Sequence, residues 1–228
     1  MVVDCRRANQ HFARPPATPL FSGAGFSEVV VREGGDVWFA AIDVHADFYQ
    51  HNIPEWLSTF CCRDGVAAGS LGVDCIDGQR VHPHTLVYPQ LCVVPQGWNW
   101  GLALVQAAHE ALLDAGTLTT RDRRAVDHRP PPSIARTPMH SLYVDNLLVE
   151  GADHDAVNCH LADGAAALRR AGLHLHEETL ASRELDMLGV RQRGDPPLVE
   201  VSPKRLQRLR GALTYMIDHH SYATAAAV

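Results

Sequence analysis

Two aspartates stand at the ends of apolar segments, where a carboxylate is unexpected. Asp43 closes the run VWFAAID of residues 37–43, and Asp145 interrupts the apolar stretch SLYVDNLLVE of residues 141–150. A carboxylate beside buried strands is costly unless it is exposed, paired or bound to a cation. If the two strand ends lie side by side, their oxygens are the hard ligands that Mg²⁺ prefers, as in metal-assisted nucleotidyl transfer. Alternatively, Asp43 caps the next helix and Asp145 only makes a turn.

Other metal-site patterns in the chain are incomplete. Six cysteines form no C-x-x-C pair, while His82-x-His84 and His174-x-His176 each put two imidazoles on one face of a strand. Without matching cysteine or carboxylate partners, these histidine pairs predict no zinc site. The cysteines are interpreted as reduced thiols of an intracellular protein.

The composition is that of an ordinary globular protein. The chain has 228 residues, of which 46% are hydrophobic and 20% are charged, and its formal net charge is −6. This balance excludes a strongly basic nucleic-acid coat protein, although it is compatible with a local basic groove. No apolar run approaches the roughly 20 residues of a membrane span, and no secretory signal is visible. We therefore expect no membrane partner and an intracellular location, cytoplasmic or nuclear.

The spacing of apolar residues predicts a mixture of helices and strands. Helices are predicted over residues 97–115, from Asp153 to Gly172, and from Ser202-Pro203 onward. Strands or hairpins are predicted at residues 2–7, 37–43, 61–90, 141–150, 173–175 and 185–190. The turn of the 141–150 hairpin is placed on Asp145-Asn146, because these residue types tolerate a positive φ. Residues 117–138, rich in Arg and Pro, predict a mobile loop, and residues 192–197 predict a linker.

Five sequence blocks, in order along the chain, resemble the motifs of one polymerase family. They are VVDCRRAN (2–9), FAAIDVHADFYQ (39–50), VVPQGWNW (93–100), LYVDNLLV (142–149), and AGLHLHEE (171–178) taken together with MLGV (187–190). In composition and order they are similar to the motifs of reverse transcriptases of the retroviral and LTR-retrotransposon type. PQGW opens a helix in that family, and YVD takes the place of the YxDD hairpin. The chain resembles a partial and degenerate copy of this domain.

The resemblance implies an α+β fold, the palm of a right-hand polymerase, in which an antiparallel sheet is backed by helices. Residues 1–36 would be partial fingers, 37–190 the palm with loop insertions at 61–90 and 117–138, and 191–228 a linker and a possible thumb or connection helix. Six basic residues lie between positions 191 and 210, against Asp195 and Glu200. On the final helix they would follow a duplex backbone, or else form an ordinary solvated face.

By the same resemblance, Asp43 and Asp145 would be catalytic carboxylates that bind Mg²⁺ (or Mn²⁺). The backbone oxygen of Val44 would be a further metal ligand. Asn146 stands where the family has the second hairpin carboxylate, so an amide replaces an anion in the catalytic hairpin and predicts weaker metal binding there. The chain also begins within the fingers motif, after the family's triphosphate-binding basic residues. Thr179 stands about where the family has a proton-donating lysine.

The resemblance also implies which residues contact the incoming nucleotide and the primer. Phe48 would close the sugar pocket and exclude a ribose 2′-hydroxyl, although the residue taken alone fits a simple core aromatic. Gln96 and Gly97 would contact the incoming nucleotide and the template, since glycine lets the backbone approach closely. Tyr143 would lie near the primer terminus.

These residues predict template-directed addition of dNTPs to a primer 3′ end by two-metal chemistry, on an RNA or DNA template, with activity impaired in this copy. Asn146 and the truncated fingers leave open whether the chain is an enzyme. The alternative is a non-catalytic palm, a remnant of a mobile element that binds nucleic acid or another protein. A third interpretation is a palm-type nucleotidyl enzyme that makes no polymer.

Overall fold

The computed structural model describes residues 4–32, 35–62 and 64–219, and these fold into two compact units. The first unit comprises Met1–Thr18 and Ala46–Ala108, and the second comprises Pro19–His45 and His109–Val228. Helix α3 (Gly101–Asp114) begins in the first unit and ends in the second. Each unit is described by itself below.

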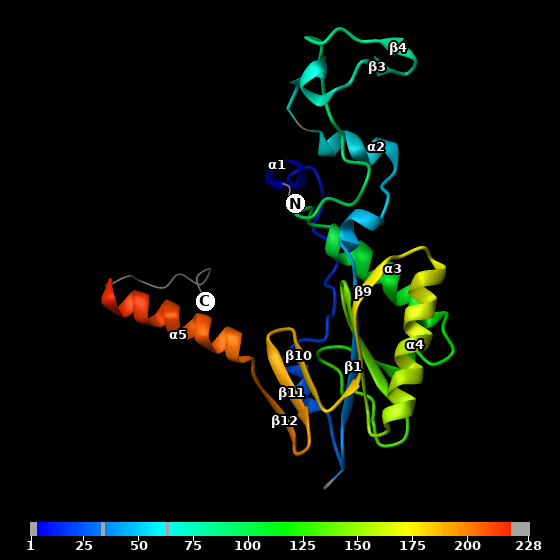
Figure 1. Cartoon of the computed structure of the whole chain (residues 1–228), viewed down its shortest axis with the longest axis vertical. Helices are drawn as coiled ribbons and strands as arrows, with labels where there is room; N and C mark the ends of the chain where they lie inside the picture. Colours follow the sequence, from blue (N-terminus) through cyan, green and yellow to red (C-terminus); the bar gives the residue numbers. More distant parts are fainter. Residues whose placement is uncertain (1–3, 33–34, 63, 220–228) are drawn as a thin grey trace. The chain divides into compact units, whose positions relative to one another are not determined.

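A five-stranded sheet forms the centre of the second unit, in the order β6-β7-β8-β1-β9 (Figure 1). Its strands are β1 (Trp38–Val44), β6 (Arg124–Ala125), β7 (Met139–Tyr143), β8 (Asn146–Gly151) and β9 (Leu175–Ser182). Only the short β6 pairs in parallel, with β7; the other neighbours in this sheet are antiparallel. The α+β class and the antiparallel sheet predicted from the sequence are confirmed.

Both faces of this sheet are buried, as predicted for the apolar run of residues 37–43. Successive side chains of a strand point to opposite faces. Ile42 therefore lies in a core shared with α4 (His154–Arg170), to which that helix contributes Leu161. Phe39 and Ala41 lie in a second core on the other face. The predicted helix between Asp153 and Gly172 is confirmed, and the Asp153 carboxylate caps it by accepting from the Ala156 amide.

A second, three-stranded sheet follows the central one along the chain. It consists of β10 (Glu184–Met187), β11 (Val190–Gly194) and β12 (Pro197–Val201). The predicted linker at residues 192–197 is wrong, because these residues end β11, turn and begin β12. Gly194 joins the two sheets: its amide donates to the Arg183 oxygen at 2.8 Å, and its oxygen accepts from the Val37 amide at 3.1 Å. A Cβ on Gly194 would collide with the Val37 carbonyl.

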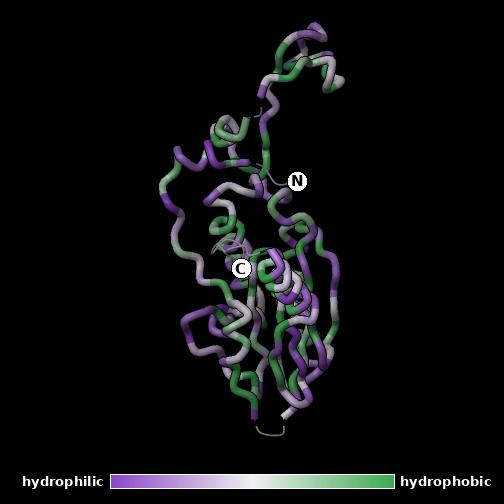
Figure 2. The backbone as a smooth tube through the Cα atoms, turned by 90° about the vertical axis from the view of Figure 1, so that its left-hand side faces the viewer, coloured by the Kyte–Doolittle hydropathy of each residue, from purple (hydrophilic) through white to green (hydrophobic). Residues whose placement is uncertain are grey.

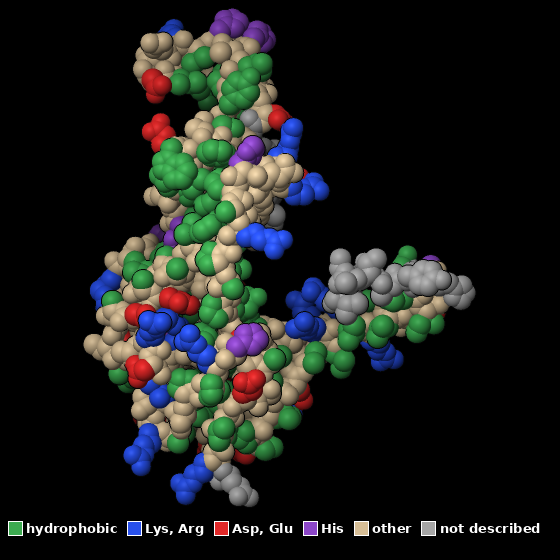
Figure 3. All heavy atoms as spheres, turned by 180° about the vertical axis from the view of Figure 1, so that it is seen from behind, with side chains coloured by type: hydrophobic (Ala, Val, Ile, Leu, Met, Phe, Trp, Pro, Cys, Tyr) green, Lys and Arg blue, Asp and Glu red, His purple; other side chains and the backbone are tan. Residues whose placement is uncertain are grey.

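The last described element of the second unit is the amphipathic helix α5 (Pro203–Asp218). The Ser202 hydroxyl caps it by accepting from the Arg205 amide, which confirms the predicted helix start. Hydrophobic and basic side chains both lie on its surface (Figure 3). Hydrophilic residues interrupt the apolar segments throughout the chain (Figure 2). Among the described residues, no helix combines the length and the apolar character needed to cross a bilayer.

The first unit is built from short elements. They are α1 (Arg6–Asn9), η2 (Asp47–Gln50), α2 (Glu55–Ser58), η3 (Thr59–Cys61), β2 (Val66–Ala67), η4 (Ala68–Leu71), β3 (Cys75–Ile76), β4 (Gln79–Arg80), β5 (Leu86–Val87) and the start of α3. The antiparallel pairs β2–β5 and β3–β4 confirm the hairpins predicted for residues 61–90. The predicted strand over residues 2–7 lies partly outside the described residues, and α1 replaces its end.

Residues 117–138, predicted as a mobile loop, contain two short regular elements. Besides η5 (Arg121–Arg123) and β6, the segment is bound at both ends by side chains. The Asp163 carboxylate accepts from the Leu118 amide at 2.7 Å and from the Thr117 hydroxyl at 2.8 Å. The Arg123 guanidinium donates to the backbone oxygens of residues 133, 137 and 138. A carboxylate of α4 and an arginine of the segment itself therefore hold it in place. The remaining element, η1 (Gly25–Glu28), also belongs to the second unit.

Candidate functional site

The aspartates singled out in the sequence lie on neighbouring chain segments of the central sheet. Strand β1 pairs antiparallel with β8, and in this register Asp43 lies opposite Asn146. One residue further on, the Val44 amide donates to the Asp145 backbone oxygen at 2.8 Å. Paired antiparallel residues have Cα atoms about 5 Å apart. The backbones of Asp43 and Asp145 therefore lie beside each other at one end of the sheet, which is the arrangement that a shared cation would require.

The hairpin that carries Asp145 turns one residue earlier than predicted. The turn is Val144-Asp145, because Tyr143 and Asn146 face each other as the last strand pair. The positive φ falls on Val144, at 55°, and not on an Asx residue. A buried β-branched residue in this conformation is strained and persists only when its surroundings hold it. His109 is one such support, because its Nδ1 lies 2.8 Å from the Val144 oxygen and must donate to it.

The amide at position 146 changes the electrostatics of the hairpin tip. The Asn146 Nδ2 donates to the Asp145 Oδ1 at 2.6 Å. Two adjacent carboxylates would repel each other, and a cation would have to relieve that repulsion. Here the neighbouring amide stabilises the single carboxylate directly. The hairpin tip therefore depends less on a bound cation than a hairpin with two acidic residues would.

Asp43 has a second neighbour that the sequence did not reveal. His176 of β9 lies opposite Asp43 in the register of the β1–β9 pair, and its Nδ1 is 3.0 Å from the Asp43 Oδ2. The His45 ring packs against the His176 ring, with centroids 5.1 Å apart and planes at 81°. The sequence signal was His174-x-His176, which has a carboxylate partner after all, brought to it by strand pairing.

A hollow of about 260 Å³ opens beside these residues in the second unit. Asp43, Asn146 and Thr179 contribute to its wall, together with residues of β10 and the turn that follows it. Thr179 is the position where a lysine was expected from the resemblance. The space next to the candidate metal ligands therefore has a hydroxyl in place of a cationic proton donor.

The predicted nucleotide-contacting residues belong to the first unit. Phe48 is half-buried, and its ring packs against Gly101 at the start of α3, where an added Cβ would lie 3.2 Å from Cε1. Gln96 and Gly97 are exposed in the preceding turn, and Gly97 has a φ of 122°. Asn9 holds this turn, since its Nδ2 donates to the Gly97 oxygen at 3.0 Å. The contacts of Phe48, Gln96 and Gly97 with a nucleotide and a template stay predictions.

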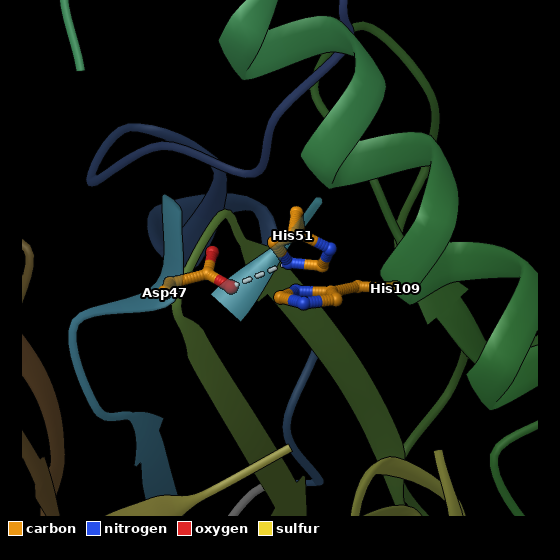
Figure 4. Close-up of side chains that lie close together, drawn as sticks. All are labelled: Asp47, His51 and His109. Carbon is orange, nitrogen blue, oxygen red and sulfur yellow. Dashed lines mark hydrogen bonds and ion pairs between the residues drawn. The ribbon is translucent and has the colours of Figure 1, made fainter. Parts of the chain in front are cut away.

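Figure 4 includes an aspartate–histidine contact of the first unit, which the sequence analysis did not single out. The His51 Nε2 lies 2.9 Å from the Asp47 Oδ1, one helical turn away. Asp47 is only 3% exposed, so its carboxylate requires such a partner. An i, i+4 spacing of Asp and His within residues 47–51 was the available signal.

The chain is similar to proteins of known structure. No family model and no curated protein sequence matches the chain. A solved structure of a foamy viral protease-reverse transcriptase in complex with double-stranded DNA matches with a TM-score of 0.61 and 16% identity, over 92% of this chain and 29% of that one. A second, with an RNA/DNA hybrid, gives a TM-score of 0.60 at 16% identity, over 92% of this chain and 23% of that one.

The fold is reverse-transcriptase-like. At 16% identity this likeness shows the fold alone, in agreement with the α+β class and the mostly antiparallel sheet expected from the sequence. The chain spans less than a third of the length of the viral proteins it matches. The division into fingers, palm and thumb segments stays a prediction, as do the roles of the individual site residues.

Proposed function

We propose that this reverse-transcriptase-like domain binds a primer–template and carries a polymerase metal site weakened by Asn146. The observation that carries the proposal is the strand register, which sets Asp43 opposite Asn146 and beside the Asp145 turn. In a sheet of this fold, these are the positions at which the resemblance implies the catalytic carboxylates. RNA or DNA templates and dNTPs are the implied partners.

The donor set fits a hard divalent cation. Two carboxylates at adjacent strand ends supply oxygen ligands, to which a backbone oxygen at Val44 would add a third, and Mg²⁺ or Mn²⁺ is bound by such groups together with substrate phosphates. The chemistry that the ion would supply is charge neutralisation at the phosphates and activation of the primer hydroxyl.

The protein's own contribution would be positioning. Tyr143 would orient the primer end, and Phe48 would exclude a ribose 2′-hydroxyl. Gln96 and Gly97 would align the incoming base with the template. With Thr179 in place of a lysine, the leaving pyrophosphate would lack a protein proton donor. Both this change and Asn146 lower the rate of nucleotide addition in the proposed mechanism.

A primer-extension assay on poly(rA)·oligo(dT), with Mg²⁺ or Mn²⁺, tests the proposal. We expect feeble incorporation by the natural chain and stronger incorporation by Asn146→Asp. That variant should also bind Mn²⁺ roughly tenfold more tightly, because an added carboxylate within several ångströms attracts a divalent ion by more than about 1.4 kcal/mol. Fluorescence or calorimetric titration with Mn²⁺ measures the affinity.

Two further variants make the assay specific. Asp43→Asn should abolish both incorporation and the gain from Asn146→Asp, because it removes a ligand of the same ion. Asn158→Asp is the matched control: its side-chain oxygen accepts from the Ala181 amide on another part of the second unit, so Mn²⁺ affinity should not change. Robust incorporation by the natural chain would refute the proposed impairment. Equal Mn²⁺ affinity of all the variants would refute the metal site.

The alternative of a non-catalytic nucleic-acid-binding domain is favoured by one observation, the exposed basic residues of α5. Lys204, Arg205, Arg208 and Arg210 are all exposed on this helix. Arginine and lysine that neutralise phosphates release counterions, so binding must weaken steeply as salt rises.

Filter binding of an RNA/DNA hybrid at about 50 mM and about 200 mM salt measures this dependence. We expect a steep negative slope for the natural chain, and a slope shallower by about two for the double variant Arg205→Glu, Arg208→Glu. Arg170→Glu, an exposed reversal on α4, is the matched control and should leave the slope unchanged. Binding without salt dependence would contradict an electrostatic role for α5.

A further inference from the structure

A hollow of about 740 Å³ lies beside the first half of α5, within the second unit. This volume is within the range of roughly 300–1,000 Å³ that is typical of small-molecule sites. Aliphatic side chains and two arginines make up most of its wall. The lining residues are Ser22, Gly23, Ala24, Val190, Val201, Arg205, Arg208, Leu209 and Ala212.

Two positive charges line this hollow, and no aspartate or glutamate does. Arg205 and Arg208 are three positions apart on α5, so their side chains are neighbours on the helix surface. Within the part of the chain that the structure describes, neither guanidinium forms an ion pair. An anion bound in the hollow would therefore meet two cations that no carboxylate of the fold neutralises.

Arg205 is held beside the hollow by its packing against a glycine. Gly189, in the turn between β10 and β11, has a φ of 78°. A Cβ at this position would lie 2.8 Å from the Arg205 Nη1 and 3.0 Å from its Cδ, so the arginine occupies the space of the missing side chain. The Ser202 amide donates to the Gly189 oxygen at 3.0 Å and ties the start of α5 to the same turn. A side chain placed in this way loses less entropy when it binds an anion.

The apolar part of the wall comes from β11, β12 and α5. Val190 begins β11, and the backbone of Gly23 lies against it, since a Cβ on Gly23 would be 3.0 Å from the Val190 Cγ1. Val201 ends β12 and is 52% exposed, and Leu209 of α5 is 43% exposed. Covering these two side chains would remove apolar surface from water.

We propose that this hollow binds a small organic phosphate with an apolar body. The phosphate would contact Arg205 and Arg208, because the planar donor groups of arginine match pairs of phosphate oxygens. A phosphate monoester has a charge of about −1.5 to −2 at neutral pH, which two arginines balance. The apolar body would cover Val201 and Leu209. The inference depends neither on the proposed metal site nor on polymerase activity.

Isothermal titration calorimetry with octyl phosphate tests the inference on the full chain. Octyl phosphate should bind at least about tenfold more tightly than either 1-octanol or inorganic phosphate, because each of these lacks one half of the ligand. Arg205→Gln and Leu209→Ser should each weaken the binding of octyl phosphate by roughly tenfold. Arg210→Gln and Leu213→Ser are the matched controls, since both positions are exposed on α5 and neither lines the hollow.

Gly189→Ala distinguishes a formed site from general attraction by a basic helix. The change leaves every charge in place and displaces the Arg205 side chain, so octyl phosphate should bind roughly tenfold more weakly. Gly172→Ala is its control, with a similar φ of 87° and nothing within 4 Å of the added Cβ, and should leave the affinity unchanged.

Two results would overturn the inference. One is equal affinity for octyl phosphate and inorganic phosphate, which would exclude a role for the apolar wall. The other is an equal loss in Arg205→Gln and Arg210→Gln, which would show attraction by the whole helix. If Gly189→Ala does not fold, the comparison of these two arginine variants decides alone.

Discussion

Replacing Glu150 with glutamine should raise the free energy of unfolding by about 3–5 kcal/mol near pH 9 and leave it almost unchanged near pH 4. Glu150 lies on β8 with only 3% of its surface exposed, and the Gln192 Nε2 donates to its Oε1 at 2.8 Å. Burial raises the pKa of this carboxyl from 4.5 to about 8, an effect that the hydrogen bond from Gln192 only partly offsets. The folded protein therefore holds the proton more tightly than the unfolded chain does.

The sign of the effect follows from linkage. With the folded pKa above the unfolded one, the stabilising contribution is complete below pH 4.5 and is lost as the pH rises towards about 8. At about 1.4 kcal/mol per pH unit, the loss reaches at most about 5 kcal/mol. Glutamine keeps the acceptor for Gln192 but cannot ionise, so the variant avoids this loss.

Urea denaturation at the two pH values measures the difference. Glu28→Gln is the matched control, because it makes the same change of residue at an exposed position in η1. It should change the free energy of unfolding by the same small amount at either pH. A Glu150→Gln effect that is equal at both pH values would show that the carboxyl ionises freely in the folded state.

Acid should destabilise the protein through a pair of buried histidines. His140 of β7 and His160 of α4 are 0% and 1% exposed, with the His160 Nε2 3.2 Å from the His140 Nδ1. Burial, together with the charge of the neighbouring ring and of Arg124, lowers the pKa of His140 from 6.5 to about 3. Burial and the nearby Arg123 lower the pKa of His160 to about 4. The neutral pair is stable in the core, whereas its charged forms are not.

Since both pKa values lie below that of an unfolded histidine, the stability contributed by the pair is complete above pH 6.5 and falls as the pH drops towards 4 and then 3. We expect several kcal/mol to be lost near pH 4. His160→Gln should lose less, because a neutral amide can still donate to the His140 ring. His154→Gln, a half-exposed histidine at the start of the same helix, is the control. Thermal unfolding between about pH 4 and pH 7 distinguishes them, and identical pH profiles would contradict the assignment.

The elements that the sequence predicted correctly are those set by local pattern. The apolar run before Asp43 is long enough for a strand and too short for a helix. The stripe after Asp153 has both a cap and a stop at Gly172. These signals depend on residues close together in the chain, and the structure confirms them.

The predictions from sequence were wrong where contacts between residues far apart in the chain determine the local structure. The hairpin turn moved by one residue because strand pairing fixes Tyr143 opposite Asn146, and the strain then falls on Val144. Residues 192–197 have the composition of a linker, yet a neighbouring strand completes their hydrogen bonds. His176 was not recognised as a neighbour of Asp43 because the register of β9 against β1 contains irregularities that no local pattern reveals.

The close contact between Gly194 and Val37 limits which parts of the two sheets can change in sequence and length. The backbone of residue 194 lies so close to the Val37 carbonyl that no side chain fits between the two sheets. Any larger residue would have to push the backbones of residues 37 and 194 apart. The hydrogen bonds that Gly194 makes with Arg183 and Val37 would then break. Insertions and changes of shape are therefore expected in the outer turns of either sheet, whereas position 194 tolerates only a hydrogen atom in place of a side chain.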